Sequence, residues 1–148
     1  MKKATGLLAA VIFSAVTWVS ASPLPLDNQK VTEAFAKEFG GASEVEWSSS
    51  EDVYIVSFKL NKDVMRAWYT ADGEVTTVQR VIQKEQMTYL SAKTVLQLSE
   101  EQTILSIAEI SKEGELYYLV KTENDNYKSI YRLSASGEAS RIEKKKKK

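Results

Sequence analysis

A turn of similar composition occurs twice in this chain, and this repetition constrains the fold more than any other feature. The two turns span residues 71–74 and 135–138, and their glycines, Gly73 and Gly137, give an offset of 137 − 73 = 64 residues. Each turn lies between segments in which polar and apolar residues alternate, as they do in the strands of an antiparallel hairpin. The sequence therefore predicts two copies of one structural unit.

Each copy is predicted to begin with a helix. In the first copy Val31, Phe35 and Phe39 recur at every fourth residue, between a candidate N-cap at Asp27 and a helix-ending Gly40. A second helical segment covers residues 88–99. Its candidate caps are Thr88 and Ser91, and its apolar positions are Leu90, Val95 and Leu98.

Four segments with strand-like alternation follow each helix, and the turns between them are short and polar. The predicted strands cover residues 43–49, 53–60, 64–70 and 74–82 in the first copy, and 103–111, 116–122, 128–134 and 138–143 in the second. The expected fold class is α+β, with two tandem copies of one helix packed on a four-stranded antiparallel meander sheet.

The N-terminal residues have the pattern of an export signal. Lys2 and Lys3 precede an apolar stretch, residues 6–19, and small residues follow at positions 20 and 21. An uncleaved anchor helix is the alternative, but 14 residues are fewer than the roughly 20 that span a bilayer core. We expect a signal peptide at 1–21, a short linker at 22–27, a domain at 28–143 with copies at about 28–82 and 86–143, and a disordered lysine tail at 144–148. The expected location is periplasmic or secreted.

Composition excludes several kinds of chemistry. The chain has no His and no Cys, so it cannot form a His-dependent nucleophile, a Cys/His zinc site or a disulfide. Without residues 1–21 and 144–148 it has 20 − 7 = 13 basic against 20 acidic residues, a balance that disfavours nucleic acid as a partner. The lysine tail is expected to be solvated, with weak contact to anionic surfaces as the alternative role.

The remaining carboxylates do not predict an active or metal site. The acidic residues of the predicted turns are expected to hydrogen-bond nearby backbone. Residues 123–126, Glu-Asn-Asp-Asn, offer oxygen ligands for calcium but lack the order of a helix-loop-helix site, so a tight hairpin is expected there. Ser91 and Lys93 are two residues apart on a helix and do not face each other. The sequence predicts no enzyme, no cofactor and no metal site.

An ordered series of motifs resembles a known family. The motifs are Phe35-Ala36-Lys37-Glu38-Phe39, Val45-Glu46-Trp47, Tyr54-Ile55-Val56-Ser57-Phe58, Met65-Arg66-Ala67-Trp68-Tyr69 and Asp72-Gly73-Glu74-Val75. Together they resemble the PepSY-like family of exported bacterial proteins, which is similar in fold to the secreted β-lactamase inhibitor protein. That inhibitor is disulfide-bonded, whereas this chain has no cysteine. The resemblance implies a non-catalytic module of the cell envelope.

The alternation along the strands sorts their side chains into two sets. The set expected beneath the helices is Tyr54, Val56, Phe58, Leu60, Met65, Ala67, Tyr69, Tyr118, Val120, Tyr131 and Leu133. The opposite set contains Trp, Tyr and Arg, the residue types of binding hot spots. Its candidate partner-binding residues are Ile55, Lys59, Arg66, Trp68, Tyr117, Leu119, Lys121, Ile130 and Arg132.

These observations predict a protein-binding, inhibitory or regulatory module. Its expected partner is an envelope or extracellular protein, with a hydrolase as one candidate. Binding of a glycan or small ligand, or a structural role in the envelope, are the alternatives. The opposite set also has an alternative interpretation, in which the two halves bend toward each other and bury part of it.

Overall fold

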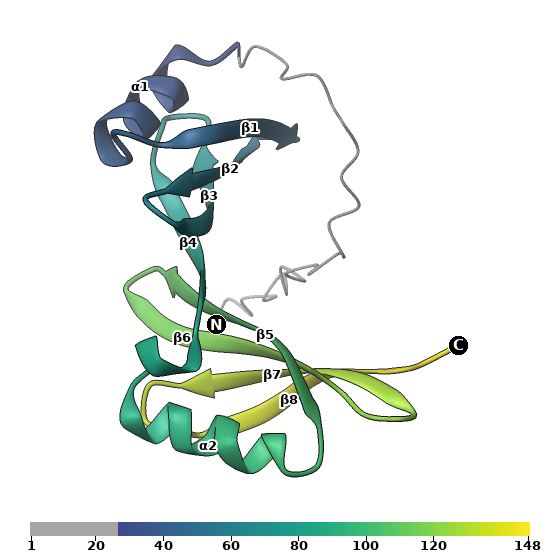
Figure 1. Cartoon of the computed structure of the whole chain (residues 1–148). Helices are drawn as coiled ribbons and strands as arrows, with labels where there is room; N and C mark the ends of the chain where they lie inside the picture. The colour runs from purple at the N-terminus through teal and green to yellow at the C-terminus, as the bar shows by residue number, and fades with distance from the viewer. Residues whose placement is uncertain (1–26) are drawn as a thin grey trace, which may run out of the picture.

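The computed structural model describes residues 27–148, and the expected signal peptide lies outside the described residues. Each of two helices precedes four strands (Figure 1). The elements are α1 (Gln29–Glu38), β1 (Ser43–Ser50), β2 (Val53–Leu60), β3 (Asp63–Thr70), β4 (Val75–Ile82), the 3₁₀ helix η1 (Lys84–Gln86), α2 (Tyr89–Ser99), β5 (Thr103–Lys112), β6 (Glu115–Glu123), β7 (Tyr127–Ser134) and β8 (Ala139–Lys146).

All eight strands form one antiparallel sheet in chain order. The expected fold class, with two separate four-stranded sheets, is therefore wrong. Strand β4 pairs with β5 from Thr77 opposite Lys112 to Ile82 opposite Ile107, and in Figure 1 β4 runs from the upper half of the molecule into the lower half. The physical reason is that a strand edge leaves backbone N–H and C=O groups unpaired, and β4 and β5 satisfy each other's groups. Side-chain alternation carries no information on that pairing.

Helix α1 packs its aromatic residues on the first four strands. The ring centroid of Phe35 lies 5.0 Å from that of Phe58 and 5.3 Å from that of Trp47, both in edge-on arrangements. The N-cap is Asn28 rather than the predicted Asp27, because the Asn28 side chain accepts a hydrogen bond from the Val31 amide at 3.2 Å. The predicted aromatic face of this helix is confirmed.

Helix α2 differs from its predicted pattern in one position. Thr88 is the N-cap and Val95 is buried, as expected, but Leu90 is 52% exposed and Ser91 is fully buried instead. A Cβ atom on Gly137, which has a φ of +88°, would lie 2.8 Å from the Leu90 carbonyl oxygen. The helix thus approaches the β7–β8 turn so closely that the helix side chain facing the turn must be small. Ser91 occupies this position, and its hydroxyl donates to the Ser134 carbonyl at 2.8 Å.

The predicted disorder of residues 144–148 is also wrong for most of the lysine run. Strand β8 extends to Lys146, with Lys144 opposite Ser129 and Lys146 opposite Tyr127. The Lys147 ammonium lies 3.3 Å from the Glu123 carboxylate. Every residue of β8 is exposed, so the lysine side chains stay hydrated while their backbone pairs with β7.

Candidate functional site

Both helices lie on the same face of the sheet. The cluster beneath α1 contains Phe58 and Tyr69, and the cluster beneath α2 contains Tyr118 and Val120. A row of paired residues crosses this face from β3 to β6 and connects the two clusters. In this row Met65 lies opposite Arg80, Arg80 opposite Glu109, and Glu109 opposite Tyr118. The predicted core set is confirmed, and the alternate side chains of every strand form the other face, which we call the helix-free face.

All nine candidate residues lie on the helix-free face. Ile55 lies opposite Trp68 on neighbouring strands, and Leu119 lies opposite Arg132. A transverse row connects the two halves across the β4–β5 pairing. This row consists of Ser57, Arg66, Gln79, Ile110 and Tyr117. Residues that the sequence placed in separate copies therefore share one continuous surface.

An arginine contacts an aromatic ring in each half of this face. The Arg66 guanidinium carbon lies 5.9 Å from the Trp68 ring, and the Arg66 Nε donates to the Ser57 hydroxyl at 3.1 Å. The Arg132 guanidinium carbon lies 4.0 Å from the Tyr117 ring, and Arg132 also pairs with Glu115. Such cation–π contacts contribute about 0.5–1 kcal/mol at exposed sites and hold the guanidinium in a fixed orientation.

The local environment shifts two ionisable groups on this face. Burial raises the pKa of the Tyr117 hydroxyl. The charge of Arg132 lowers this pKa and the charge of Glu115 raises it, and the net shift is upward, so Tyr117 is a neutral hydrogen-bonding group at pH 7. Burial lowers the pKa of the Lys121 ammonium, and this effect is partly offset by Glu143. Both shifts follow from the cost of placing charge away from water.

The two halves of the face differ in burial. Trp68 and Arg66 are half-buried, whereas Tyr117 is 8% exposed and Leu119 is 3% exposed. These two residues form a cluster with Ala108 and Ile110 of β5. The second half of the helix-free face is thus the more apolar part and is largely buried, as the alternative interpretation of this set expected for part of it.

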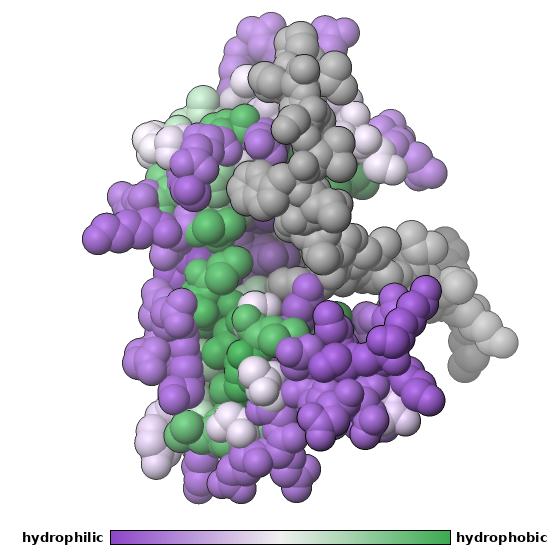
Figure 2. Space-filling view, turned by 45° about the vertical axis from the view of Figure 1, so that its right-hand side comes forward, coloured by the Kyte–Doolittle hydropathy of each residue, from purple (hydrophilic) through white to green (hydrophobic). Residues whose placement is uncertain are grey.

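Sequence reasoning missed the central part of this face. Lys59 lies opposite Val64 on β3, and a second row runs from Val81 through Ala108 and Leu119 to Arg132. Apolar side chains therefore lie between two basic ones. Val64 is 50% exposed and Val81 is 37% exposed. Figure 2 shows a band of hydrophobic side chains along the molecule between hydrophilic ones. The alternation of Ala108 and Ile110 around Glu109 was the signal that could have found these positions.

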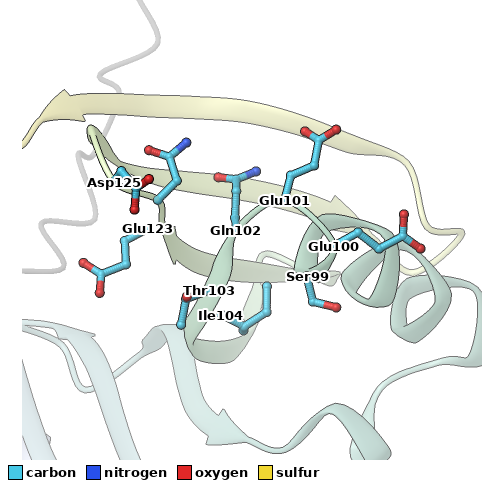
Figure 3. Close-up of a pocket in the computed structure, with 9 residues that line it drawn as sticks. Ser99, Glu100, Glu101, Gln102, Thr103, Ile104, Glu123 and Asp125 are labelled. Atoms are coloured by element: carbon cyan, nitrogen blue, oxygen red, sulfur yellow. The ribbon is translucent and has the colours of Figure 1, made fainter.

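A hollow at the end of α2 is lined by acidic residues, but their carboxylates do not converge on one point. Its lining includes Glu100, Glu101, Glu123 and Asp125, and Figure 3 shows their carboxylates pointing in different directions. Among residues 27–148 no group of three or more acidic side chains could hold a metal ion. The predicted tight hairpin is confirmed, since the Asn124 side-chain oxygen accepts from the amides of residues 126 and 127.

Comparison with known proteins identifies the fold. No family model matches the chain, and no curated protein matches its sequence. A crystal structure from Bacteroides eggerthii, described as "putative periplasmic proteins", matches with a TM-score of 0.70 and 15% identity over 80% of this chain and 87% of that one. A DUF2874 family protein from Bacteroides ovatus matches with a TM-score of 0.69 and 15% identity over 80% and 86% of the two chains.

A BLIP-like protein from Bacteroides fragilis matches with a TM-score of 0.66 and 12% identity over 80% of this chain and 84% of that one. In the part of the chain that the structure describes, no helix is long and apolar enough to cross a membrane. Membership of the PepSY-like family stays a prediction. At these identities the likeness establishes the architecture alone, and that architecture is the BLIP-like fold.

Proposed function

We propose that this chain is an exported, non-catalytic binding protein of the periplasm or cell exterior that captures a protein partner on its helix-free face. The observation that carries the proposal is the placement of all nine candidate residues on one face, with a guanidinium–aromatic pair in each half. On this face Arg66, Trp68 and Arg132 are partly exposed, whereas Tyr117 and Leu119 are buried. Arg, Trp and Tyr are the residue types that dominate binding energy at protein interfaces. This protein would regulate or inhibit its partner by covering part of the partner's surface.

The dimensions of the face suit such a partner. Seven spacings of about 4.8 Å between eight strands give a width of roughly 34 Å. Strands of eight residues are about 26 Å long, which brings the face to roughly 900 Å². A stable protein interface covers about 800 Å² on each partner. The outline of the whole face, with the buried positions Tyr117 and Leu119 included, is therefore about the size of one standard interface.

The chemistry of the face indicates what the partner presents. The exposed apolar side chains of Val64 and Val81 would receive an apolar or aromatic segment, whereas Leu119 is already buried. The two basic residues each already have a carboxylate partner on this chain: Lys59 pairs with Glu44 at 2.8 Å, and Arg132 pairs with Glu115. These pairs form a charged rim around an apolar centre, as in many protein interfaces.

The neighbours support the cellular setting and the kind of partner. One is described as periplasmic and another as BLIP-like, which suits a binding module outside the cytoplasm. A hydrolase is the partner class that we favour. Saturable, stoichiometric loss of its activity on addition of this protein is the expected sign of inhibition.

A pair of double variants tests the proposal. Trp68→Ala with Arg132→Ala removes one side chain from each half of the face. Tyr89→Ala with Lys93→Ala removes an exposed aromatic residue and an exposed cation from α2. Cross-linked capture from an envelope fraction, followed by mass spectrometry and titration with the purified partner, should show binding lost in the first variant and kept in the second.

The alternative functions give different results in the same experiment. Retention on a polysaccharide column that resists salt but needs Trp68 would indicate a glycan-binding protein instead. A partner that both double variants capture equally well would show that the helix-free face is not the binding surface. Unfolding curves of both variants separate loss of binding from loss of folding.

A further inference from the structure

A small polar pocket lies on the helix-bearing face, beyond the C-terminal end of α2. Side chains of β7 and β8 line it together with Glu101 and Gln102, which follow the helix. Its volume is about 190 Å³. Pockets for drug-sized ligands measure about 300–1,000 Å³, so this one suits a ligand of about one sugar ring.

Two cations of the C-terminal strand line the pocket. In the β7–β8 register Arg141 lies opposite Tyr131 and Lys144 lies opposite Ser129. The Lys144 ammonium nitrogen lies 3.9 Å from the centre of the Tyr127 ring. Among residues 27–148 the ion pairs include neither Arg141 nor Lys144. Among the described residues that line the pocket Glu101 is the single carboxylate, so their net charge is positive and favours an anion.

A serine hydroxyl faces the same pocket. Ser129 is only 5% exposed, and its side chain forms no hydrogen bond with the described residues. No buried side-chain oxygen of the described residues lacks a hydrogen-bond partner, so the Ser129 hydroxyl oxygen is open to the water of the pocket. The hydroxyl of Ser129 is thus available to donate to a bound group.

The neighbouring polar groups of the pocket are held in place. The Gln102 side-chain nitrogen donates to the Tyr131 hydroxyl at 3.1 Å, and its oxygen accepts from the Thr122 hydroxyl at 2.7 Å. Thr122 is fully buried, so this chain of hydrogen bonds is anchored in the core. A wall fixed in this way needs little reorganisation when a ligand binds.

We propose that this pocket binds a ligand of monosaccharide size that bears an oxyanion, either a carboxylate or a phosphate. The guanidinium of Arg141 and the ammonium of Lys144 would hold the anion, and the Ser129 hydroxyl would donate to it. The carboxylate of Glu101 would accept hydrogen bonds from ligand hydroxyl groups. This site lies on the opposite face of the sheet from the proposed protein interface and does not depend on it.

Titration of the ¹⁵N-labelled full chain with small probes tests the proposal. The probes are sodium glucuronate, inorganic phosphate and neutral glucose, at constant ionic strength. We expect saturable amide shifts at Ser129, Tyr131 and Arg141 with at least one oxyanion probe, and at least tenfold weaker binding of glucose. Saturable shifts with glucuronate alone would identify the ligand as a carboxylated sugar. Saturable shifts with phosphate alone would identify its anionic group as a phosphate. Saturation by neither, or equal binding of glucose, would overturn the proposal.

Two lysine variants provide a matched pair for this experiment. Lys144→Ala removes a charge that lines the pocket, whereas Lys145→Ala removes the same charge from the next residue, which does not line it. We expect the oxyanion to bind at least tenfold more weakly to Lys144→Ala and unchanged to Lys145→Ala. Equal weakening would show diffuse attraction to the lysine run and would overturn the site. Trp68→Ala with Arg132→Ala should leave this binding unchanged, so the two proposals can fail independently.

Discussion

The Arg80 guanidinium on β4 donates to the Glu109 carboxylate on β5 at 2.9 Å, across the pairing that joins the two halves of the sheet. Arg80 also lies 3.5 Å from the Asp63 carboxylate. The Arg80 and Glu109 side chains are 33% and 21% exposed, so water screens their interaction only in part. This ion pair lies on the helix-bearing face, between the cores beneath α1 and α2.

A double-mutant cycle on Arg80 and Glu109 should detect the interaction between their side chains across β4 and β5. We expect Arg80→Ala and Glu109→Ala to show a coupling of about 1 kcal/mol, at the upper end of the 0.2–1 kcal/mol of exposed pairs, because this pair is partly buried. Urea unfolding of the two single variants and the double variant provides the measurement. Additive effects would mean that the side chains do not interact across β4 and β5.

Gly137 and Gly114 provide a matched test of how closely α2 approaches the β7–β8 turn. Both have a positive φ, but a Cβ on Gly114 would meet nothing within 4 Å, whereas one on Gly137 would meet the Leu90 carbonyl oxygen at 2.8 Å. We expect Gly114→Ala to cost about 1 kcal/mol from backbone strain alone. Gly137→Ala should cost about 1–3 kcal/mol more, because the helix must move. Equal losses in thermal unfolding would contradict the close contact.

Opposite faces of β2 should respond differently to truncation. Phe58 is 2% exposed beneath α1, so Phe58→Ala should lower the free energy of unfolding by about 3–5 kcal/mol. Ile55 lies half-buried on the helix-free face, and Ile55→Ala should cost about 1 kcal/mol. Chemical denaturation of both variants checks the assignment of faces. A larger loss for Ile55→Ala would reverse it.

Stability should fall in alkaline solution because of Tyr69. Burial, with a further contribution from Glu38, raises the pKa of the Tyr69 hydroxyl above that of an unfolded tyrosine. The folded protein therefore binds this proton more tightly than the unfolded protein does. The contribution of the protonated Tyr69 to the free energy of unfolding is complete below about pH 10 and is lost as the pH rises above it. Tyr69→Phe should show a weaker decline of unfolding free energy between about pH 10 and 12. Identical pH profiles would exclude Tyr69 as the cause.

Local pattern was sufficient to predict the elements and their faces. Period-two alternation placed Phe58 and Val120 beneath the helices and Trp68 and Arg132 opposite them, because a strand fixes the direction of every second side chain. It could not predict that β4 pairs with β5, which depends on backbone groups far apart in sequence. The centre of the helix-free face, with Val81 on β4 and Ala108 on β5, was missed for that reason.

Two further differences have similar causes. Leu90 was expected in the core, but the close approach of α2 to Gly137 turned Ser91 inward instead. The lysine run was expected to be disordered from its charge, yet β7 provides backbone partners that do not depend on side-chain type. In both cases tertiary contact outweighed local composition.

The pairing of β4 with β5 is the central claim, because it makes two halves into one face. Gln79 lies opposite Ile110, and Val81 lies opposite Ala108. Nuclear Overhauser measurements between the backbone protons of these strands test it most directly, since paired Cα atoms in an antiparallel sheet are about 4.5–5.5 Å apart. We predict cross-strand signals for both residue pairs. Their absence, with β2–β3 and β6–β7 signals intact, would show two independent sheets and contradict the account.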